Sequence, residues 1–210
     1  MEAIQMSTKA ELDVAYSLWA ERLVNEGWTP YLLTFMFGDI EGPVHEVARI
    51  MEREVERIYA TVLSRIIRNP NRVGMIGKHP VWICCHDRPV YKLVKTTLRD
   101  VTVNDGRHIH AVALIPPWSR MSEGLADHFD GHRALYLRPD SSLIRIHTVP
   151  ITRRVGYVTT YVRKHTRRGA HGEDAGFILP RTLDEIRDRG CLKKRKKAGL
   201  FLPRPSLSLT

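Results

Sequence analysis

The chain has 210 residues, of which 43% are hydrophobic, so its composition excludes a disordered protein and predicts one fairly large domain, alone or with tails. Lys and Arg number 33 against 23 Asp and Glu, which gives a formal net charge of +10. A basic surplus of this size favours a polyanionic partner, nucleic acid before an anionic membrane. The alternative is a basic protein with a solvated positive face.

The three cysteines, Cys84, Cys85 and Cys191, form neither a C-x-x-C spacing nor a disulfide framework. An odd number without such a framework fits a reducing compartment. The first ten residues do not have the form of a signal peptide, and no apolar run reaches the ~20 residues that span a bilayer. We therefore expect a soluble, cytoplasmic protein with no membrane partner.

The first half of the chain predicts helices and strands in alternation. Thr8-Lys9-Ala10-Glu11 has the form of a capping box and predicts a helix to about Asn25, with an apolar face of Leu12, Ala15, Tyr16, Trp19 and Leu23. The aromatic and β-branched run from Trp28 to Phe37 predicts a strand. Pro43 is placed to begin a long amphipathic helix that Asn69-Pro70 ends, and Val81 to His86 predicts a second strand.

Asn104-Asp105-Gly106 lies between two β-rich runs, Tyr91 to Val103 and Arg107 to Ile115, and predicts a three-residue hairpin loop. That loop would pair Thr102 with His108 and Asp100 with His110. Because side chains alternate along a strand, His108, His110 and Asp100 would then share one face of the sheet. A two-residue loop would shift the pairing by one and move Asp100 to the other face.

The second half of the chain predicts shorter elements. Pro116-Pro117 ends the preceding strand. The further expectations are a short helix from Met121 to Phe129, strands at Ala134 to Leu137 and Leu143 to Thr148, a helix from about Ile151 to Thr166 and another short helix from Thr182 to Arg189. The segment from Arg167 to Gly176 is basic and glycine-rich. Lys193 to Lys197 forms a basic cluster, and a solvated tail is a simpler interpretation of it than a DNA-binding tail or an interaction tag.

The helix from Ile151 to Thr166 carries two phenols and an ammonium group on one face. At about 100° per residue, Tyr157, Tyr161 and Lys164 fall within about 60° of one another. Val155, Val158 and Val162 fall on a different face and can supply the core-facing stripe alone. A tyrosine pair at this spacing is commonly core packing, and the valine stripe removes the need for that role.

Two same-face imidazoles with a carboxylate form a plausible divalent metal site with open positions, which makes His108, His110 and Asp100 the candidate ligands. The alternative is two ordinary histidines on a half-exposed strand. A tyrosine hydroxyl is a weak nucleophile unless basic neighbours such as Lys164 activate it. Attack by such a hydroxyl on DNA would leave a 5′-phosphotyrosine and a free 3′-hydroxyl, in a step that can be reversed to rejoin strands.

Three ordered motifs resemble those of the HUH endonucleases, the replication initiators of rolling-circle phages and plasmids. Tyr31-Leu32-Leu33-Thr34-Phe35 resembles the first-motif strand, and Arg107-His108-Ile109-His110-Ala111-Val112 resembles the His-hydrophobic-His metal strand. Tyr157-Val158-Thr159-Thr160-Tyr161-Val162-Arg163-Lys164 is similar to the tyrosine helix of the two-tyrosine subgroup. The resemblance covers residues 30 to 166, about two thirds of the chain.

This resemblance implies that Tyr157 and Tyr161 are nucleophiles, that Lys164 assists them, and that His108 and His110 bind Mg²⁺ or Mn²⁺. It implies an α+β fold in which an antiparallel sheet carries the histidines on a central strand with the tyrosine helix beside that face. The expected organisation is an N-terminal helix (1–28), an HUH nuclease domain (29–168) and a basic, partly disordered C-terminal extension (169–210). The expected reaction is nicking and joining of single-stranded DNA or a DNA hairpin at an origin.

The chain lacks a helicase-type phosphate loop, so unwinding would need a host or partner helicase. Tyr161 with Lys164 alone would correspond to a single-tyrosine initiator or transposase-type nuclease. The competing class is a nucleic-acid-binding module or autoregulator without catalysis, since sheets of this kind also stack bases on aromatic side chains. Arg138, Arg145, Arg163, Arg167 and Arg168 are candidate phosphate contacts, although each is individually a common type of solvated surface charge.

Overall fold

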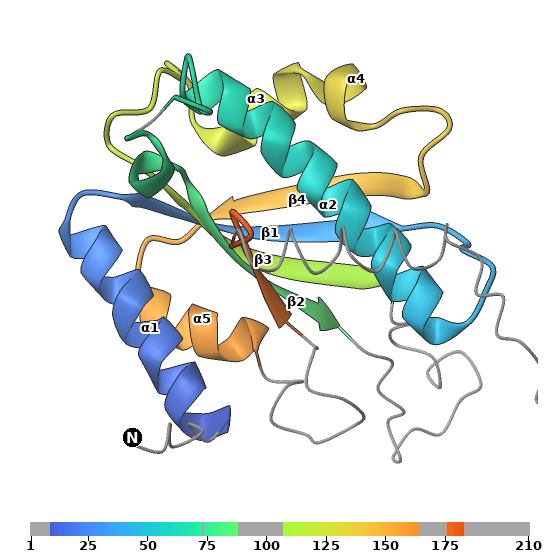
Figure 1. The fold of residues 1–210 in the computed structure, drawn as a ribbon, viewed down its shortest axis with the longest axis horizontal. Helices are drawn as coiled ribbons and strands as arrows, with labels where there is room; N and C mark the ends of the chain where they lie inside the picture. The colour runs from blue at the N-terminus through green and yellow to red at the C-terminus, as the bar shows by residue number, and fades with distance from the viewer. Residues whose placement is uncertain (1–8, 73, 88–106, 164–175, 183–210) are drawn as a thin grey trace, which may run out of the picture. The chain divides into compact units, whose positions relative to one another are not determined.

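The fold is built on a five-stranded antiparallel sheet with the strand order β4-β1-β3-β2-β5. The strands are β1 (Thr29–Phe37), β2 (Val81–Asp87), β3 (His108–Ile115), β4 (Leu143–Pro150) and β5 (Gly176–Leu179). The computed structural model describes residues 9–72, 74–87, 107–163 and 176–182, and the elements named here belong to one compact unit that ends at Pro180. Helices lie on both faces of the sheet (Figure 1), which confirms the expected α+β class.

β3 is the middle strand and is paired along both of its edges. Thr34 and Met36 of β1 lie opposite His110 and His108, and on the other edge Asp87 of β2 lies opposite His108. The predicted hairpin register is therefore wrong, because the backbone positions beside the two histidines are occupied by β1 and β2. The segment from Tyr91 to Val103 lies outside the described residues.

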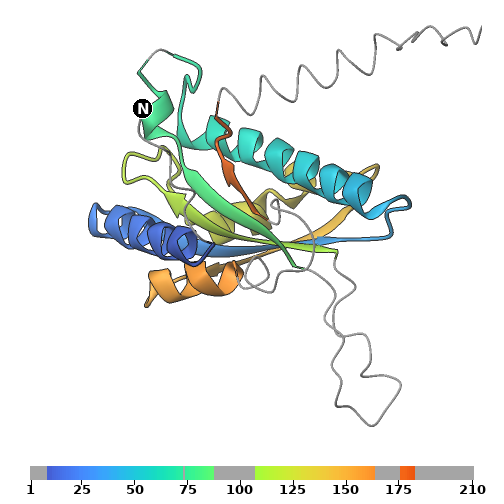
Figure 2. The same cartoon turned by 60° about the horizontal axis from the view of Figure 1, so that its bottom comes forward.

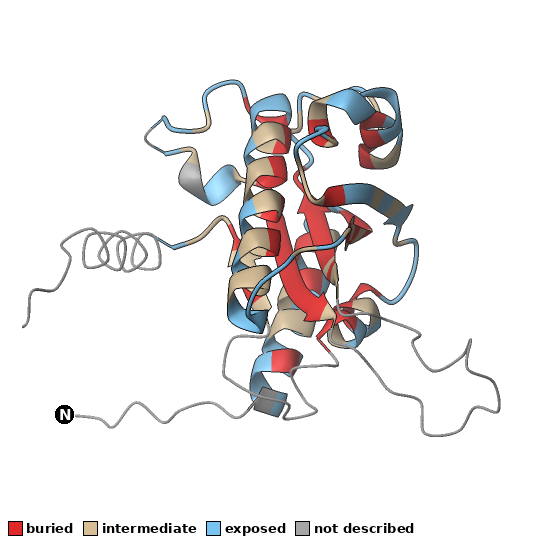
Figure 3. Ribbon diagram, turned by 90° about the vertical axis from the view of Figure 1, so that its right-hand side faces the viewer, coloured by how far each residue is buried: buried red, intermediate tan, exposed pale blue. Residues whose placement is uncertain are grey.

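One face of the sheet is covered by α2 (Val44–Ile66), α3 (Leu125–Gly131) and the single turn α4 (Arg133–Tyr136). Pro43 is the N-cap of α2, and the buried positions of this helix recur at helical spacing: Met51, Val55, Ile58, Tyr59, Val62 and Ile66. Figure 3 shows the burial concentrated in the strands and on the side of α2 that faces them. Alternate residues of the strands, such as Leu33, Phe35 and Ile109, complete this core.

The opposite face is covered by α1 (Lys9–Asn25) and α5 (Val155–Val162), which lie side by side in Figures 1 and 2. Ala20 and Leu23 of α1 meet Val155 and Val162 of α5 over the strand residues that point this way, which include Ile83, Val112 and Leu114. The sheet thus separates two cores, and adjacent residues of a strand contribute to different ones.

Several local expectations differ from the structure. The predicted strand Ala134 to Leu137 is instead part of α4, whose turn is closed by backbone bonds from Leu135 and Leu137 to the carbonyls of His132 and Arg133. β5 was not predicted and joins the sheet from within the expected C-terminal extension. Along α1, Leu12 and Ala15 are exposed, because the buried face is rotated and includes Asp13.

The remaining short element is η1, a 3-10 turn at Ile76–Lys78. The predicted helix from Thr182 to Arg189 and the basic cluster at Lys193 to Lys197 lie outside the described residues, except for Thr182, which is in no element. None of the helices in the described part of the chain has the length and apolarity that crossing a bilayer requires.

Replacing a core leucine should lower the free energy of unfolding by several kcal/mol more than replacing a surface leucine. Leu33 is fully buried at the centre of β1, whereas Leu18 on α1 is 60% exposed. We expect Leu33→Ala to lower the free energy of unfolding by about 2–5 kcal/mol, because it removes buried methyl groups and leaves a cavity. Leu18→Ala should change it by less than about 0.5 kcal/mol. Urea unfolding followed by tryptophan fluorescence measures both, and equal effects would contradict the assignment of β1 to the core.

Candidate active site

His108 and His110 begin the central strand and point toward the face that carries α1 and α5. Their position follows from strand alternation, since Val112 and Leu114 on the same strand are in the core beneath those helices. Both imidazoles are half-buried. His110 Nδ1 lies 3.0 Å from Thr34 Oγ1, and its Nε2 lies 3.2 Å from an oxygen of Asp87. The structure therefore brings the Thr34 hydroxyl, the His110 imidazole and the Asp87 carboxylate together.

Asp87 is a site residue that the sequence reasoning missed. It is the last residue of β2 and lies directly opposite His108 across the β2–β3 pair. The predicted strand stopped at His86, although one more residue continues the alternation that places Cys85 and Asp87 on one face. The proposed ligand Asp100 lies outside the described residues and stays a prediction.

The contacts of His110 are compatible with a divalent cation. If Nδ1 donates to the Thr34 hydroxyl, the lone pair of Nε2 faces the Asp87 carboxylate, an arrangement that a cation between them would stabilise. Two ligands at neighbouring positions of an octahedral Mg²⁺ would be roughly 3 Å apart, close to the 3.2 Å observed here. In the other tautomer, Nε2 donates directly to Asp87. His108, His110 and Asp87 do not all have donor atoms within 4.8 Å of one another.

A second polar cluster combines Glu123, His128 and His132, whose donor atoms do lie within 4.8 Å of one another. Both ring nitrogens of His128 make short hydrogen bonds. Nδ1 lies 2.6 Å from a carboxylate oxygen of Glu123, and Nε2 lies 2.7 Å from the hydroxyl of Tyr136. The His128 hydrogen bond lowers the pKa of Glu123 to about 2, and burial raises the pKa of Tyr136 to about 12. Direct bonds this short hold α3 and α4 together and leave His128 no free lone pair for a metal.

The tyrosine helix α5 presents its phenols to solvent. Tyr157 is 68% exposed and Tyr161 is 47% exposed, whereas Val155 and Val162 are buried against the sheet. The expected division between a valine face and a tyrosine face is therefore confirmed. The helix begins four residues later than predicted, because Arg154 has a left-handed backbone conformation (φ 55°) that no regular helix contains.

α1 holds α5 through polar contacts as well as apolar packing. The Ser17 hydroxyl donates to the Gly156 carbonyl at 2.5 Å and lies 2.9 Å from the Thr160 hydroxyl. The side chain of Glu21 lies directly over Gly156, at a place where any Cβ would overlap it. A side chain at position 156 would therefore displace the exposed end of Glu21.

A buried ion pair fixes the C-terminal end of α5. Arg163, the C-cap residue, donates to Asp13 at 2.7 Å, and its guanidinium carbon lies 4.3 Å from the centre of the Tyr16 ring. Asp13 is fully buried and Arg163 is 8% exposed. Arg163 is therefore a structural residue, and the expectation that it contacts phosphate is wrong. Arg167 and Arg168 lie outside the described residues.

The structure places the histidine strand and the tyrosine helix on the same side of the sheet. In Figures 1 and 2, α5 runs beneath the sheet with its C-terminal end toward the edge where β3 begins and β2 ends. Tyr161 lies in the last turn of α5, and His108 is the first residue of β3. Lys164 follows the described part of α5 and lies outside the described residues.

We expect Asp13→Asn to lower the free energy of unfolding by about 3–5 kcal/mol, because it leaves the buried guanidinium of Arg163 without its counter-charge. Glu26→Gln is the matched control, since Glu26 pairs with Arg22 in an exposed contact on the same helix that should contribute no more than about 0.5 kcal/mol. The double variant Asp13→Leu/Arg163→Met should be more stable than Asp13→Asn. Equal destabilisation by Asp13→Asn and Glu26→Gln in urea unfolding would contradict the structural role of the pair.

Comparisons with protein-family models, with curated proteins and with solved structures found no match to this chain.

Proposed function

We propose that the protein is a metal-dependent nuclease of the HUH type that nicks and rejoins single-stranded DNA at an origin or hairpin and so initiates rolling-circle replication. The observation that carries the proposal is the placement of His108 and His110 on the sheet face that also holds the tyrosine helix. The exposure of both tyrosines supports it further, since a nucleophile must reach its substrate. The charge of +10 agrees with a polyanionic substrate.

In the proposed reaction the phenolic oxygen of Tyr161 or Tyr157 attacks a backbone phosphorus. The bond from tyrosine oxygen to phosphorus forms, and the bond from phosphorus to the 3′ oxygen breaks. The phenol loses its proton and the leaving 3′ oxygen gains one. The 5′-phosphotyrosine keeps the number of phosphoester bonds constant, so attack by a 3′-hydroxyl rejoins the strand without an external energy source.

His110 and Asp87 would hold a Mg²⁺ or Mn²⁺ ion, and His108 on the same face would complete the set. When bound, such an ion supplies charge that polarises the phosphodiester. Thr34 orients the His110 ring from the opposite side, in the manner of residues that fix the tautomer of a ligating histidine. In this proposal Asp87 would be the carboxylate ligand, and Asp100 stays a second candidate for that role.

Tyr161 is proposed as the principal nucleophile, because it lies in the last turn of α5, at the end directed toward the start of β3. Tyr157 lies one turn earlier and is more exposed. If both act, alternate attacks allow a second cleavage while the first DNA end is still held. If only Tyr161 acts, the enzyme makes one cut for each covalent intermediate.

Phenylalanine substitution separates these roles, because it removes the nucleophilic oxygen and keeps the ring. We expect Tyr161→Phe to reduce nicking of a labelled single-stranded origin or hairpin DNA by at least about a hundredfold, and Tyr157→Phe to reduce it less. The double variant should form no covalent adduct on a denaturing gel with Mn²⁺. Tyr31→Phe, a buried tyrosine in the other core, is the matched control and should nick normally. Nicking by the double variant at the rate of the parent would exclude the mechanism.

Removal of the metal ligands should change the metal dependence of nicking. We expect His110→Ala to abolish nicking and Asp87→Asn to raise the Mn²⁺ concentration needed for half-maximal rate by about 10–100-fold, a range typical of residues that support metal ligands. His45→Ala, an exposed histidine on α2, should behave like the parent. An unchanged Mn²⁺ dependence in both site variants would refute this ligand set, and DNA binding in EDTA without nicking under any metal would favour a binding module.

A further inference from the structure

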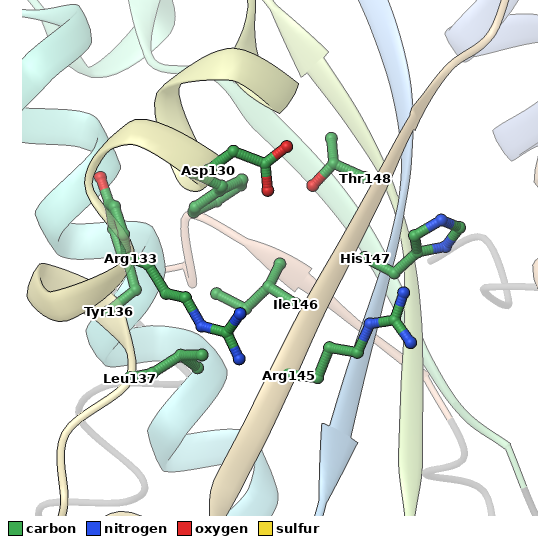
Figure 4. A pocket seen from close by; sticks show the side chains of 9 residues that line it. Asp130, Arg133, Tyr136, Leu137, Arg145, Ile146, His147 and Thr148 are labelled. Atoms are coloured by element: carbon green, nitrogen blue, oxygen red, sulfur yellow. The ribbon is translucent and has the colours of Figure 1, made fainter.

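A cleft of about 530 Å³ lies between α4 and β4, apart from the candidate active site (Figure 4). Arg133 and Tyr136 line it from α4, and Arg145, Ile146, His147 and Thr148 line it from β4. β4 is an edge strand of the sheet, with β1 as its partner on the inner side only. Its outer side is therefore accessible to a ligand.

The cleft presents hydrogen-bond donors that the described residues leave unused. Arg133, Arg145 and His147 are exposed and make no ion pair or hydrogen bond with any residue that the structure describes. The hydroxyl oxygen of Thr148 is buried and likewise has no hydrogen-bond partner there. Asp130 is the one carboxylate among the lining residues. An excess of cationic donors of this kind suits a ligand with negatively charged oxygens, and guanidinium groups suit phosphate in particular.

Because side chains alternate along β4, those of Arg145 and His147 point to the other face of the sheet, the one that carries His108 and His110. His147 lies opposite Thr34, which in turn lies opposite His110, and Arg145, Met36 and His108 form the next cross-strand row. Two strand spacings separate β4 from β3, a distance of roughly 10 Å. An anionic chain that occupies the cleft can reach the histidines by passing round the outer edge of β4 and then crossing β1 on the other face.

The arrangement of the two arginines favours a chain of phosphates over a single anion. Figure 4 shows the side chains of Arg133 and Arg145 on opposite sides of the β4 ribbon. Ile146 and Leu137 add apolar surface to the cleft on the same side of β4 as Arg133, which suits the sugars and bases of an unpaired strand.

We propose that this cleft binds successive phosphates of the single-stranded DNA that flanks the nicking site, and that the strand then passes round the edge of β4 and across β1 to His110. Arg133 and Arg145 contact the phosphates, and Thr148 and His147 add hydrogen bonds. The inference rests on the proposed nuclease function, because the strand is the substrate of that reaction. It assigns to these residues a role in binding and positioning the DNA, and no role in forming or breaking bonds.

The test measures the affinity of the full-length protein for a fluorescein-labelled, mixed-sequence single-stranded oligonucleotide by anisotropy in EDTA. We expect Arg133→Gln and Arg145→Gln each to weaken binding about tenfold, as the loss of a charge-assisted contact does. Each should also reduce the slope of log affinity against log salt by about 0.7, the value for one phosphate of a single strand. Arg72→Gln removes an exposed arginine that lines neither the cleft nor the candidate site and should leave both quantities unchanged.

Nicking kinetics give a second readout. With saturating Mn²⁺ and varied DNA concentration, Arg133→Gln and Arg145→Gln should raise KM and keep kcat, because neither side chain takes part in the reaction. Binding and KM equal to those of the parent would overturn the inference even if nicking itself is normal. Equally tight binding of the corresponding duplex would overturn the assignment to a single strand.

The two proposals fail in different ways. If the parent binds the oligonucleotide through Arg133 and Arg145 but forms no nick or adduct, the cleft inference holds and the nuclease function is wrong. If the parent nicks through Tyr161 and both arginine variants behave like Arg72→Gln, the nuclease function holds and the cleft inference is wrong.

Discussion

The backbone hydrogen bonds that join β3 to β1 on one edge and to β2 on the other determine where every residue of the candidate site lies. Pairing on both edges fixes the pleat of β3, so the side chains of His108 and His110 must point to the face of α1 and α5. The same register brings Thr34 and Asp87 to opposite sides of the His110 ring. A shift of one residue would turn both imidazoles into the core beneath α2.

The second part of the site depends on contacts that α5 cannot make alone. A helix of eight residues is too short to be stable by itself, so its position is set by what packs against it. Valines attach it to the sheet, and α1 attaches it through Ser17, Glu21 and the buried Asp13–Arg163 pair. These attachments lie on the inner side, and both phenols remain exposed to solvent. Stability and the proposed chemistry thus use different faces of one helix.

Local periodicity was sufficient to predict most elements and the outward position of the tyrosines, whereas the α+β class was expected from the resemblance of the motifs. Local periodicity also placed both histidines on one face, because strand alternation is a local property. Asp87 was missed because its approach to His110 depends on the pairing of β2 with β3, which nearby residues do not specify. The sequence instead predicted a hairpin after residue 90, which gave β3 a pairing partner closer along the chain than β2. Asp13 was missed on α1 because its burial is explained only by Arg163, 150 positions later.

The sheet keeps its two cores apart, since neighbouring strand residues such as Cys84 and Cys85 are buried in different layers. Opening of the α1–α5 layer would therefore expose one core while the α2 layer stayed packed on the other face. The histidines belong to the strand framework, whereas the tyrosines belong to the α1–α5 layer. In a two-step nicking and joining cycle, such a division would let the covalently held DNA end move with its helix while the site for the next attack stays in place.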